Sequence, residues 1–433
     1  MEKKKQIILI TVGVILYFFA NIQRVAIPGA VFDLLQRDLN ASAPYITALG
    51  SAFMYIYAIC QLFIGISVDR FGGTRVITFG SIFFFVGAIL FPISNSLPLL
   101  YLSRILVGIG SSTIYLSLIN EIKNTFSSKN FGLMLSVALF VGYMGGIFAN
   151  APFVLCVDKF GWREVLLFIG ILTAAFSLLF IFVGMSTEKK KINKKVKFNL
   201  EPFKKVLQNK HNINLFIFAG VNYGIYYVLQ TVIGLKFIED FCGFSVNTAA
   251  LILSCMAGLY SVSGPVFAFL SKALYTRKAV FLKLVGCLCF SITGLISIFL
   301  LFDINTKIIA MLMLILAFSA SLSPLLVPLI HDTNKKEITG TAVSMMTCMF
   351  YIFVGLFGNL TGILMNVFPP EKMANGVLKY NSHSYLLIFA VLFGLSIISL
   401  YNVFKLSDSI KTRRLLHIRN IHNEKEQISY VTH

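Results

Sequence analysis

One stretch near the amino terminus, YFFANIQRVAIPGAVFDLL (residues 17–35), places polar side chains inside an otherwise apolar segment. At helical spacing Tyr17, Asn21 and Arg24 share one face, because residues three and four apart are neighbours on a helix. A buried arginine costs about 2.5–3.5 kcal/mol at the centre of a membrane helix and cannot escape by deprotonation. The guanidinium of Arg24 could bind a carboxylate or phosphate through two parallel hydrogen bonds. Alternatively, Arg24 extends outward to the membrane surface or pairs with Asp33 at the helix end.

Two further polar patterns occur later in the chain, again inside apolar segments. The first repeats every four residues, as one face of a helix does: Asn222, Tyr226 and Gln230. The second consists of Ser319 and Ser323. Asn222 and Gln230 could line a cavity or hydrogen-bond to neighbouring helices, and both alternatives stay open. For Tyr227 the enrichment of tyrosine at membrane interfaces favours an anchoring role at the bilayer surface.

The composition requires a bilayer as the solvent. Hydrophobic residues make up 57% of the 433 residues and charged residues only 13%, whereas soluble domains carry about a quarter charged residues. So few charges could not cover a core of this size in water. The seven cysteines form no CxxC pair, and neither HExxH nor GxSxG occurs. We therefore expect no metal, no cofactor and no enzymatic activity.

Windows of about 20 apolar residues predict twelve membrane-spanning helices. They lie near residues 7–31, 44–66, 76–95, 98–119, 131–153, 165–185, 213–236, 247–270, 279–302, 307–330, 340–367 and 384–404. The first is too long for a signal peptide and lacks an A-x-A cleavage site, so we retain it as a helix. The predicted fold class is an all-α membrane protein.

Basic residues orient this bundle and divide the chain. With the amino terminus inside, most of the 37 Lys and Arg fall in cytoplasmic segments, as the positive-inside rule requires. The net charge of +19 then reports topology and contact with anionic lipid rather than nucleic acid. The run EKKKINKKVK reads as a solvated linker. We expect a six-helix half (1–185), a basic cytoplasmic linker (186–212), a second six-helix half (213–404) and a cytoplasmic tail (405–433).

Short matches predict that the two halves are repeats. Asp69–Arg75, between spans two and three, and Ser271–Arg277, between spans eight and nine, share a basic residue and a Thr-Arg pair. FGLMLSVA (131–138) and TGTAVSMM (339–346) open spans five and eleven with Gly and Ser in register. Because both matches fall at equivalent places, we predict two six-helix pseudo-repeat halves.

The stretch GISVDRFGGTR (65–75) resembles the loop signature of the major facilitator superfamily, between the same two spans. RILVGIG (104–110), GYMGGIFANAP (142–152) and FGWREVLLFIG (160–170) resemble other signatures of that family. The resemblance covers the chain up to about residue 405 and implies a carrier that works by alternating access. The family's antiporters usually carry a Gly-Pro pair in span five, and its absence from GYMGG makes drug/proton antiport less expected.

The resemblance also implies roles for the signature residues. Gly65 would allow close helix approach, and Gly72 with Gly73 a sharp turn. The charged residues would form a cytoplasmic latch that is made when the carrier opens outward and broken when it opens inward: Asp69, Arg70 and Arg75. Spans 1, 4, 7 and 10 would line a central cavity, and spans 3, 6, 9 and 12 would face lipid.

Two arginines lie inside spans and differ in what the resemblance implies for them. Arg104, in span four, matches a position present in many family members, and a packing or coupling role is at least as expected as ligand contact. The stretch 17–35 around Arg24 is similar to a bacterial branch of solute importers, which includes the phagosomal transporters of amino acids and nucleosides in intracellular bacteria.

No carboxylate lies at mid-depth in any predicted span. The acidic residues nearest the bilayer are Asp33, on the outside, and Glu121, at the cytoplasmic end of span four. Coupling could use Asp33, Glu121 or His331, and uniport or a proton carried on the substrate are alternatives. A basic substrate is disfavoured, because no buried acid is available to pair with it.

Together these features predict a monomeric secondary active transporter of the bacterial inner membrane, with both termini cytoplasmic. Its expected partners are a small-molecule substrate, protons and lipid. The favoured substrate is a neutral amino acid imported with protons. Arg24 would hold its carboxylate, and Asn21, Asn222 and Gln230 could accept hydrogen bonds from its ammonium group. An organic anion, such as a monocarboxylate or sugar acid, is the first alternative. A sensor or scaffold in a carrier fold is the second.

Overall fold

The computed structural model describes residues 2–186, 200–273, 278–302, 304, 306–321, 323–373 and 376–406. Within these residues, twelve helical segments are long and apolar enough to cross a membrane. Each overlaps one of the twelve predicted spans, which confirms the all-α membrane fold class. The predicted cytoplasmic tail lies outside the described residues except for its first two positions.

The first half of the chain forms one helical bundle. Its elements are α1 (Glu2–Ala26), the 3-10 helix η1 (Gly29–Val31), α2 (Phe32–Leu39), α3 (Ala43–Phe71), α4 (Gly73–Ile93), α5 (Leu97–Ser112), α6 (Ile114–Thr125), α7 (Ser128–Phe148), α8 (Ala151–Phe160) and α9 (Trp162–Met185). The fourth span is therefore two helices, α5 and α6. The short helices α2 and α8 were not predicted.

The second half forms the other bundle. Its elements are α10 (Glu201–Gln208), α11 (Lys210–Thr231), α12 (Gly234–Asp240), α13 (Val246–Ala273), α14 (Lys278–Leu301), α15 (Thr306–Leu316), the 3-10 helix η2 (Ala317–Ser319), α16 (Ser323–Thr333), α17 (Lys336–Met365), the paired strands β1 (Glu371–Lys372) and β2 (Leu378–Lys379), and α18 (Ser382–Phe404). Helix α10 lies within the segment that the sequence had assigned to a linker.

Two predicted span ends were wrong, and both errors affect the function. The first span ends at Ala26 rather than at residue 31, and Pro28, which has no N–H to continue the helix, follows. The seventh span ends at Thr231 rather than at residue 236, and a separate helix, α12, begins at Gly234. Asp33 and Lys236 therefore lie on short helices beyond the ends of the spans.

The glycine signature is almost entirely helical, not a loop. Helix α3 continues to Phe71 and α4 starts at Gly73, so only Gly72 connects them, with a positive φ of 84° that favours glycine. A Cβ on Gly73 would lie 2.6 Å from the Ser117 carbonyl oxygen, so this glycine permits close packing of α4 on α6. Gly65 permits no such approach, because a Cβ there would meet only the Ser344 hydroxyl at 3.8 Å.

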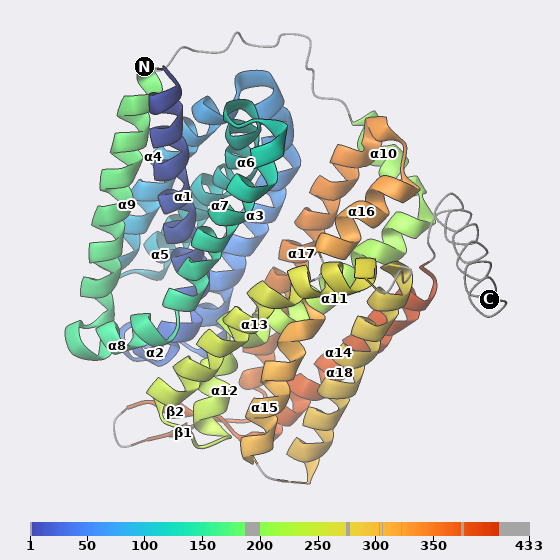
Figure 1. The fold of residues 1–433 in the computed structure, drawn as a ribbon. Coiled ribbons are helices and arrows are strands. Elements are labelled where there is room, and N and C mark those ends of the chain that lie inside the picture. Colours follow the sequence, from blue (N-terminus) through green and yellow to red (C-terminus); the bar gives the residue numbers. More distant parts are fainter. Residues whose placement is uncertain are drawn as a thin grey trace, which may run out of the picture.

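The two bundles lie side by side and differ in spacing at their two ends (Figure 1). We call the end that holds the start of α1 and the end of α18 the terminal face, and the other end the distal face. The bundles spread apart toward the terminal face and converge at the distal face (Figure 1). On the distal side, the Ser51 hydroxyl of α3 donates to the Gly355 carbonyl of α17 (2.9 Å). The Ala151 N–H of α8 donates to the Ser254 hydroxyl of α13 (2.9 Å). Two helix pairs thus seal the distal side.

Candidate functional site

A cavity of about 310 Å³ lies between the two bundles. Its walls come from α1, α3, α6 and α7 of the first half and from α11, α13, α16 and α17 of the second. Tyrosines dominate these walls: Tyr17, Tyr57, Tyr115, Tyr143, Tyr223, Tyr226, Tyr227, Tyr260 and Tyr351. The volume suits a small metabolite, and the phenol groups offer both ring faces and hydroxyls.

Arg24 supplies the positive charge of this cavity. It lies in the last turn of α1 and its residue surface is only 8% exposed. Its Nη1 donates to the hydroxyl of Tyr351, on α17 of the other half, at 2.7 Å. Its Nη2 donates to the Asn21 side-chain oxygen, while the Asn21 amide donates to the Tyr17 carbonyl at 2.9 Å. Asn21 thus fixes the orientation of the guanidinium, which also lies 5.7 Å from the centre of the Tyr227 ring.

The partners of Arg24 leave its charge unbalanced. Among the described residues it forms no ion pair, so the expected alternative of an Arg24–Asp33 pair is wrong. The residues described as lining the cavity include no Asp or Glu and no second Lys or Arg. Arg24 Nε and Gln230 Nε2 are buried and have no hydrogen-bond partner within the described part of the chain. The cavity therefore presents one full positive charge and free N–H donors, a combination that suits an anion.

Helix α11 turns a different face to the cavity than the one predicted. Tyr223, Tyr226, Tyr227 and Gln230 line it, at the i, i+3, i+4, i+7 spacing of one helix face. Asn222 lies beside that face, is fully buried and does not line the cavity. The four-residue spacing of the predicted stripe drifts around the helix, and this is why it included Asn222. The predicted interfacial role for Tyr227 is also wrong, since its ring faces Arg24 inside the cavity.

The sequence predicted that two serines of span ten line the cavity, and this is more than the structure shows. It also missed four other spans that line the cavity. Ser319 is buried in η2, donates to the Leu316 carbonyl (2.7 Å) and does not line the cavity. The Ser323 side chain lies outside what the structure describes, and among the described side chains of α16 Val327 lines the cavity. Spans 2, 5, 8 and 11 line the cavity beside spans 1, 4, 7 and 10, because the halves meet through α3/α17 and α7/α13. Among the described residues, none from spans 3, 6, 9 and 12 lines it.

Two of the missed tyrosines, Tyr57 and Tyr351, had a sequence signal. In α3, Tyr57 is followed by Gln61 at i+4, and in α17 Ser344, Thr347 and Tyr351 follow the spacing i, i+3, i+7. Each pattern is a polar stripe in an apolar span, of the kind that singled out Arg24. All five side chains line the cavity.

Arg104 is a second buried arginine with a different environment. Its surface is fully buried and it does not line the cavity. Its guanidinium donates to the carbonyl oxygens of Gln23 (2.9 Å), Leu49 (3.3 Å) and Ile27 (3.4 Å) and lies 4.8 Å from the centre of the Phe53 ring. Backbone carbonyls of α3 and of the end of α1 thus hold this charge. The geometry is that of a packing residue rather than of a ligand contact.

The predicted latch residues lie at the terminal face. Asp69 and Arg70 occupy the last turn of α3, and Arg75 the first turns of α4, where its guanidinium donates to the Phe71 carbonyl (3.5 Å). Within the described residues, none of the three forms an ion pair. At the corresponding positions of the second half stand Ser271, Lys272 and Arg277. Arg277 and the side chains of Ser271 and Lys272 lie outside what the structure describes.

Glu121 tightens the first half. Its carboxylate accepts a hydrogen bond from the Thr74 N–H (3.0 Å) and so joins α6 to the start of α4. A carboxylate at that place satisfies one of the free N–H groups of the first helical turn.

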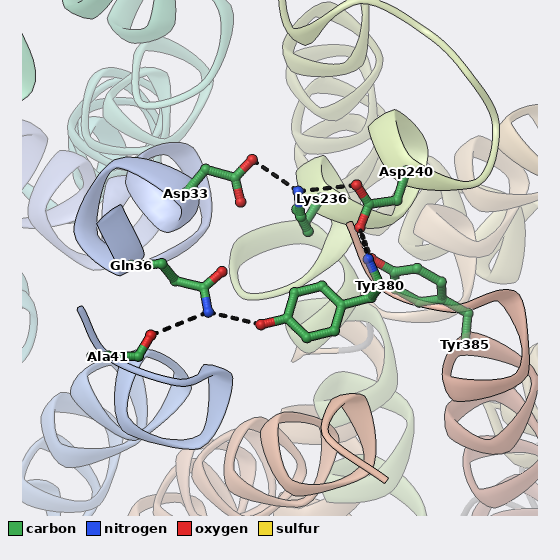
Figure 2. A network of polar contacts seen from close by, with 7 residues as sticks. All are labelled: Asp33, Gln36, Ala41, Lys236, Asp240, Tyr380 and Tyr385. Carbon is green, nitrogen blue, oxygen red and sulfur yellow. Dashed lines mark hydrogen bonds and ion pairs between the residues drawn. The ribbon is translucent and has the colours of Figure 1, made fainter. Parts of the chain in front are cut away.

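Charged residues at the distal face form a separate network. Lys236 of α12 pairs with Asp33 of α2 and with Asp240 of its own helix, both at 2.9 Å (Figure 2). The sequence singled out Asp33 but not its partner. The sequence did not single out Lys236, because it falls at the predicted end of span seven. A lysine at such a place usually extends to the membrane surface.

Comparison with known protein families agrees with the twelve-helix fold. The profile of the Major Facilitator Superfamily matches residues 13–359. Among solved structures, a bacterial homologue of the human lysosomal transporter Spinster, in an inward-facing and unoccupied conformation, superimposes with a TM-score of 0.70 at 14% identity, covering 92% of this chain and 96% of the other. The nucleoside transporter NupG gives a TM-score of 0.67 at 14% identity, over 92% and 99% of the two chains. At such identities the likeness concerns the fold alone.

Curated relatives match a shorter part of the chain. A chloroplastic ascorbate transporter of Arabidopsis thaliana is 26% identical over 175 residues, which is 40% of this chain and 32% of the relative. A probable sulfoacetate transporter, SauU, of Cupriavidus necator is 25% identical over 168 residues, 39% of each chain. The matched region thus spans about a third of the length of these relatives.

Proposed function

Because this chain belongs to the major facilitator superfamily, and is thus a membrane transporter of that type, we propose that it carries a small organic anion through the cavity around Arg24. The observation that carries this proposal is the unbalanced charge of that arginine. A buried cation is ordinarily paired, and Arg24 has only neutral partners among the described residues. A carboxylate or sulfonate bound there would neutralise it and accept from its Nε.

The remaining cavity walls favour a substrate that carries hydroxyl groups in addition to its acid group. The amides of Gln61 and Gln230 and the hydroxyls of Ser261, Ser344 and Thr347 line the cavity together with the tyrosines. Hydroxyl-bearing substrates exchange hydrogen bonds with such groups, while their C–H faces pack on the rings. A sugar acid is therefore the substrate class that we favour.

The relatives support an anion. Two of them are named as transporters of ascorbate and of sulfoacetate, both of which are anions. The chain matches only part of each relative, so their cargo is support for the proposal and no more.

A neutral amino acid, the substrate favoured from the sequence, is the second candidate. Its carboxylate would use Arg24 in the same way. Its ammonium group would have to rely on ring faces and on amide oxygens such as that of Gln230, since no described residue that lines the cavity is acidic. The observation that supports this candidate is the stacked pair Tyr226–Tyr260, with ring centres 4.9 Å apart, because such ring faces attract an ammonium group.

Transport would proceed by alternating access. If the basic segments lie in the cytoplasm, as the positive-inside rule predicts, the terminal face is cytoplasmic and the distal face external. The conformation described here is then closed to the outside. Import requires the distal seal to open so that the anion can reach Arg24.

Substitution of Arg24 tests the proposal. Arg24→Lys keeps the charge but loses the planar fork, and we expect the affinity for the anion to fall by about 1–3 kcal/mol, roughly 5- to 150-fold. Arg24→Ala should lose more and should no longer distinguish the acid from its amide. Gluconate, gluconamide, alanine and alaninamide, titrated by calorimetry into purified protein, cover both candidates.

Two outcomes would refute parts of this scheme. Equal affinity of the wild type for acid and amide would exclude carboxylate recognition by Arg24. Tighter binding of alanine than of gluconate would favour the amino acid over the sugar acid. As a matched control, Arg163→Lys alters an arginine that donates to the Pro92 and Ser94 carbonyls, away from the cavity, and should leave all four affinities unchanged.

A further inference from the structure

The network at the distal face joins the two halves through one lysine. Lys236 is 1% exposed and lies between Asp33 of the first half and Asp240 of the second, at 2.9 Å from each (Figure 2). Gln36, one turn after Asp33, donates to the Tyr380 hydroxyl at 2.7 Å and so makes a second bond between the halves. Nearby, Gly29 lies against the Thr231 carbonyl so closely that no Cβ would fit. The distal seal is therefore both tightly packed and charged.

The two ion pairs of Lys236 differ in what separation of the halves would do to them. The Lys236–Asp240 pair lies within α12 and would survive. Asp240 is also held by the Tyr385 hydroxyl (2.8 Å) and by the Tyr380 N–H (3.0 Å), both of the second half. The Asp33–Lys236 pair crosses between the halves and would break. Lys236 would thus keep one partner in the open state, and only Asp33 would lose its partner.

The charges around Lys236 do not balance. The titratable groups that face it are Asp33 from α2, Glu239 and Asp240 from α12, Tyr380 before α18 and Tyr385 within it. Three carboxyl groups therefore share one ammonium group. Burial raises the pKa of Asp33 despite the neighbouring lysine, and burial together with Asp33 raises the pKa of Glu239 to about 7. Both shifts favour proton uptake at this face.

We infer that the Asp33–Lys236 pair is the lock of the distal face, and that a proton taken up by Asp33 from that side releases it. A neutral Asp33 no longer attracts Lys236, which remains paired with Asp240, so the seal loses its ionic bond without stranding a buried cation. If the chain carries an anion, as proposed above, this proton opens the distal face to the substrate. The proton and the anion would then enter together, although their sites are separate.

Distance measurements between spin labels test the lock without any substrate. Ile93, at the distal end of α4, and Leu301, at the distal end of α14, are exposed positions on opposite halves. Spin-labelled noncanonical residues at these two positions leave the native cysteines in place. In nanodiscs, the population with a long label distance should rise as the pH falls from 7.5 to 5.5. Asp33→Asn should raise that population roughly 5-fold or more already at pH 7.5 and abolish its pH response.

Two further variants complete the test. Asp38→Asn is the matched control, because Asp38 lies on the same helix and accepts from the Trp162 ring N–H of its own half (2.8 Å). It should respond to pH like the parent protein. Lys236→Gln removes the lock from the other side and should reproduce Asp33→Asn.

Three results separate the inference from the proposed function. Parental distances in Asp33→Asn would overturn the lock. An unlocked Asp33→Asn that still responds to pH would overturn Asp33 as the proton acceptor. Arg24→Lys should keep the parental pH response, so a failure of anion binding leaves the lock intact, and a failure of the lock leaves anion binding intact.

Discussion

Among the described residues, the cavity and the charged network at the distal face each contain one buried cation, and the two cations are paired in opposite ways. Lys236 has two carboxylates at 2.9 Å, one from each half. Arg24 has a tyrosine hydroxyl and an amide oxygen, and its Nε has no partner among the described residues. Both residues connect the halves, since Asp33 and Tyr351 each lie across the interface from the cation they contact.

This difference indicates what each cation does. A cation whose charge is neutralised by protein stabilises the arrangement that supplies the partners, and here that is the closed distal face. A cation that faces a cavity with an unpaired donor and only neutral partners costs free energy until a ligand neutralises it.

Arg104 extends the comparison to a third buried cation and gives the largest expected effect. Arg104→Leu removes donors to three carbonyls, and we expect it to lower the free energy of unfolding by about 2–4 kcal/mol. The same change at Arg24 should leave the stability of the ligand-free protein unchanged or raise it, because Arg24 lies at a cavity with an unpaired Nε. Loss of Arg104, in contrast, leaves three buried carbonyls without their donor. Thermal unfolding of both variants at one scan rate measures the contrast.

Ligand binding supplies the second half of this contrast. The surviving Arg104→Leu protein should bind the anion with parental affinity, whereas Arg24→Leu should not bind it. Equal losses of stability in the two variants would contradict the assignment of Arg24 to binding.

A packing change tests whether the distal seal depends on shape as well as charge. Gly362 of α17 faces Thr47 of α3, and a Cβ there would lie 2.9 Å from the Thr47 Cβ. Gly362→Ala should therefore disfavour the closed distal face by about 1–3 kcal/mol, roughly 5- to 150-fold. The label pair at Ile93 and Leu301 would report this as a larger long-distance population at pH 7.5.

The control for Gly362→Ala is a glycine elsewhere in the second half. Apart from the adjacent turns of α18 itself, no atom of the described residues lies within 4 Å of a Cβ added to Gly394, so Gly394→Ala should leave the distances unchanged. The pH response should persist in Gly362→Ala, because its ionic lock is intact. Loss of that response would mean that packing, and not Asp33, senses the proton.

Much of the fold and part of the site could be predicted from the sequence. Hydropathy predicts twelve spans because apolar length is a local property of the sequence. Helical spacing placed Tyr17, Asn21 and Arg24 on one face of the first span, and all three line the cavity. Spacing alone could not tell which face of α11 turns inward, so Asn222 was included and Tyr227 was not. The partners Tyr351 and Lys236 lie across the interface, and their contacts depend on how the halves dock.

Helix ends were the other source of error. An apolar window continues smoothly from α1 into η1 and from α11 into α12, so hydropathy extended both spans too far. The short helices that carry the lock were absorbed into the spans. This is why the sequence offered Asp33 as a partner for Arg24 rather than for Lys236.

The smallest expected effect concerns Glu239, a half-buried neighbour of the lock. Its pKa is raised from 4.5 to about 7, first by burial and then by Asp33. The unfolded chain therefore loses this proton near pH 4.5 and the folded protein only near pH 7. The free energy of unfolding should accordingly fall as the pH rises between these values. Glu239→Gln cannot ionise and should lose that part of the decline.

Thermal midpoints at pH 5 and pH 7.5 measure this contribution, and we expect the drop between them to shrink by about 2–4 °C in Glu239→Gln, since partial exposure screens the charge. Glu371→Gln, at an exposed position in β1, is the control and should keep the parental drop. Glu239 interacts electrostatically with Asp33 and Lys236 but forms no ion pair between the halves among the described residues, so its substitution should leave the label distances responsive to pH. If Glu239→Gln abolishes that response instead, then the proton that opens the distal face binds on α12, and Asp33 only follows.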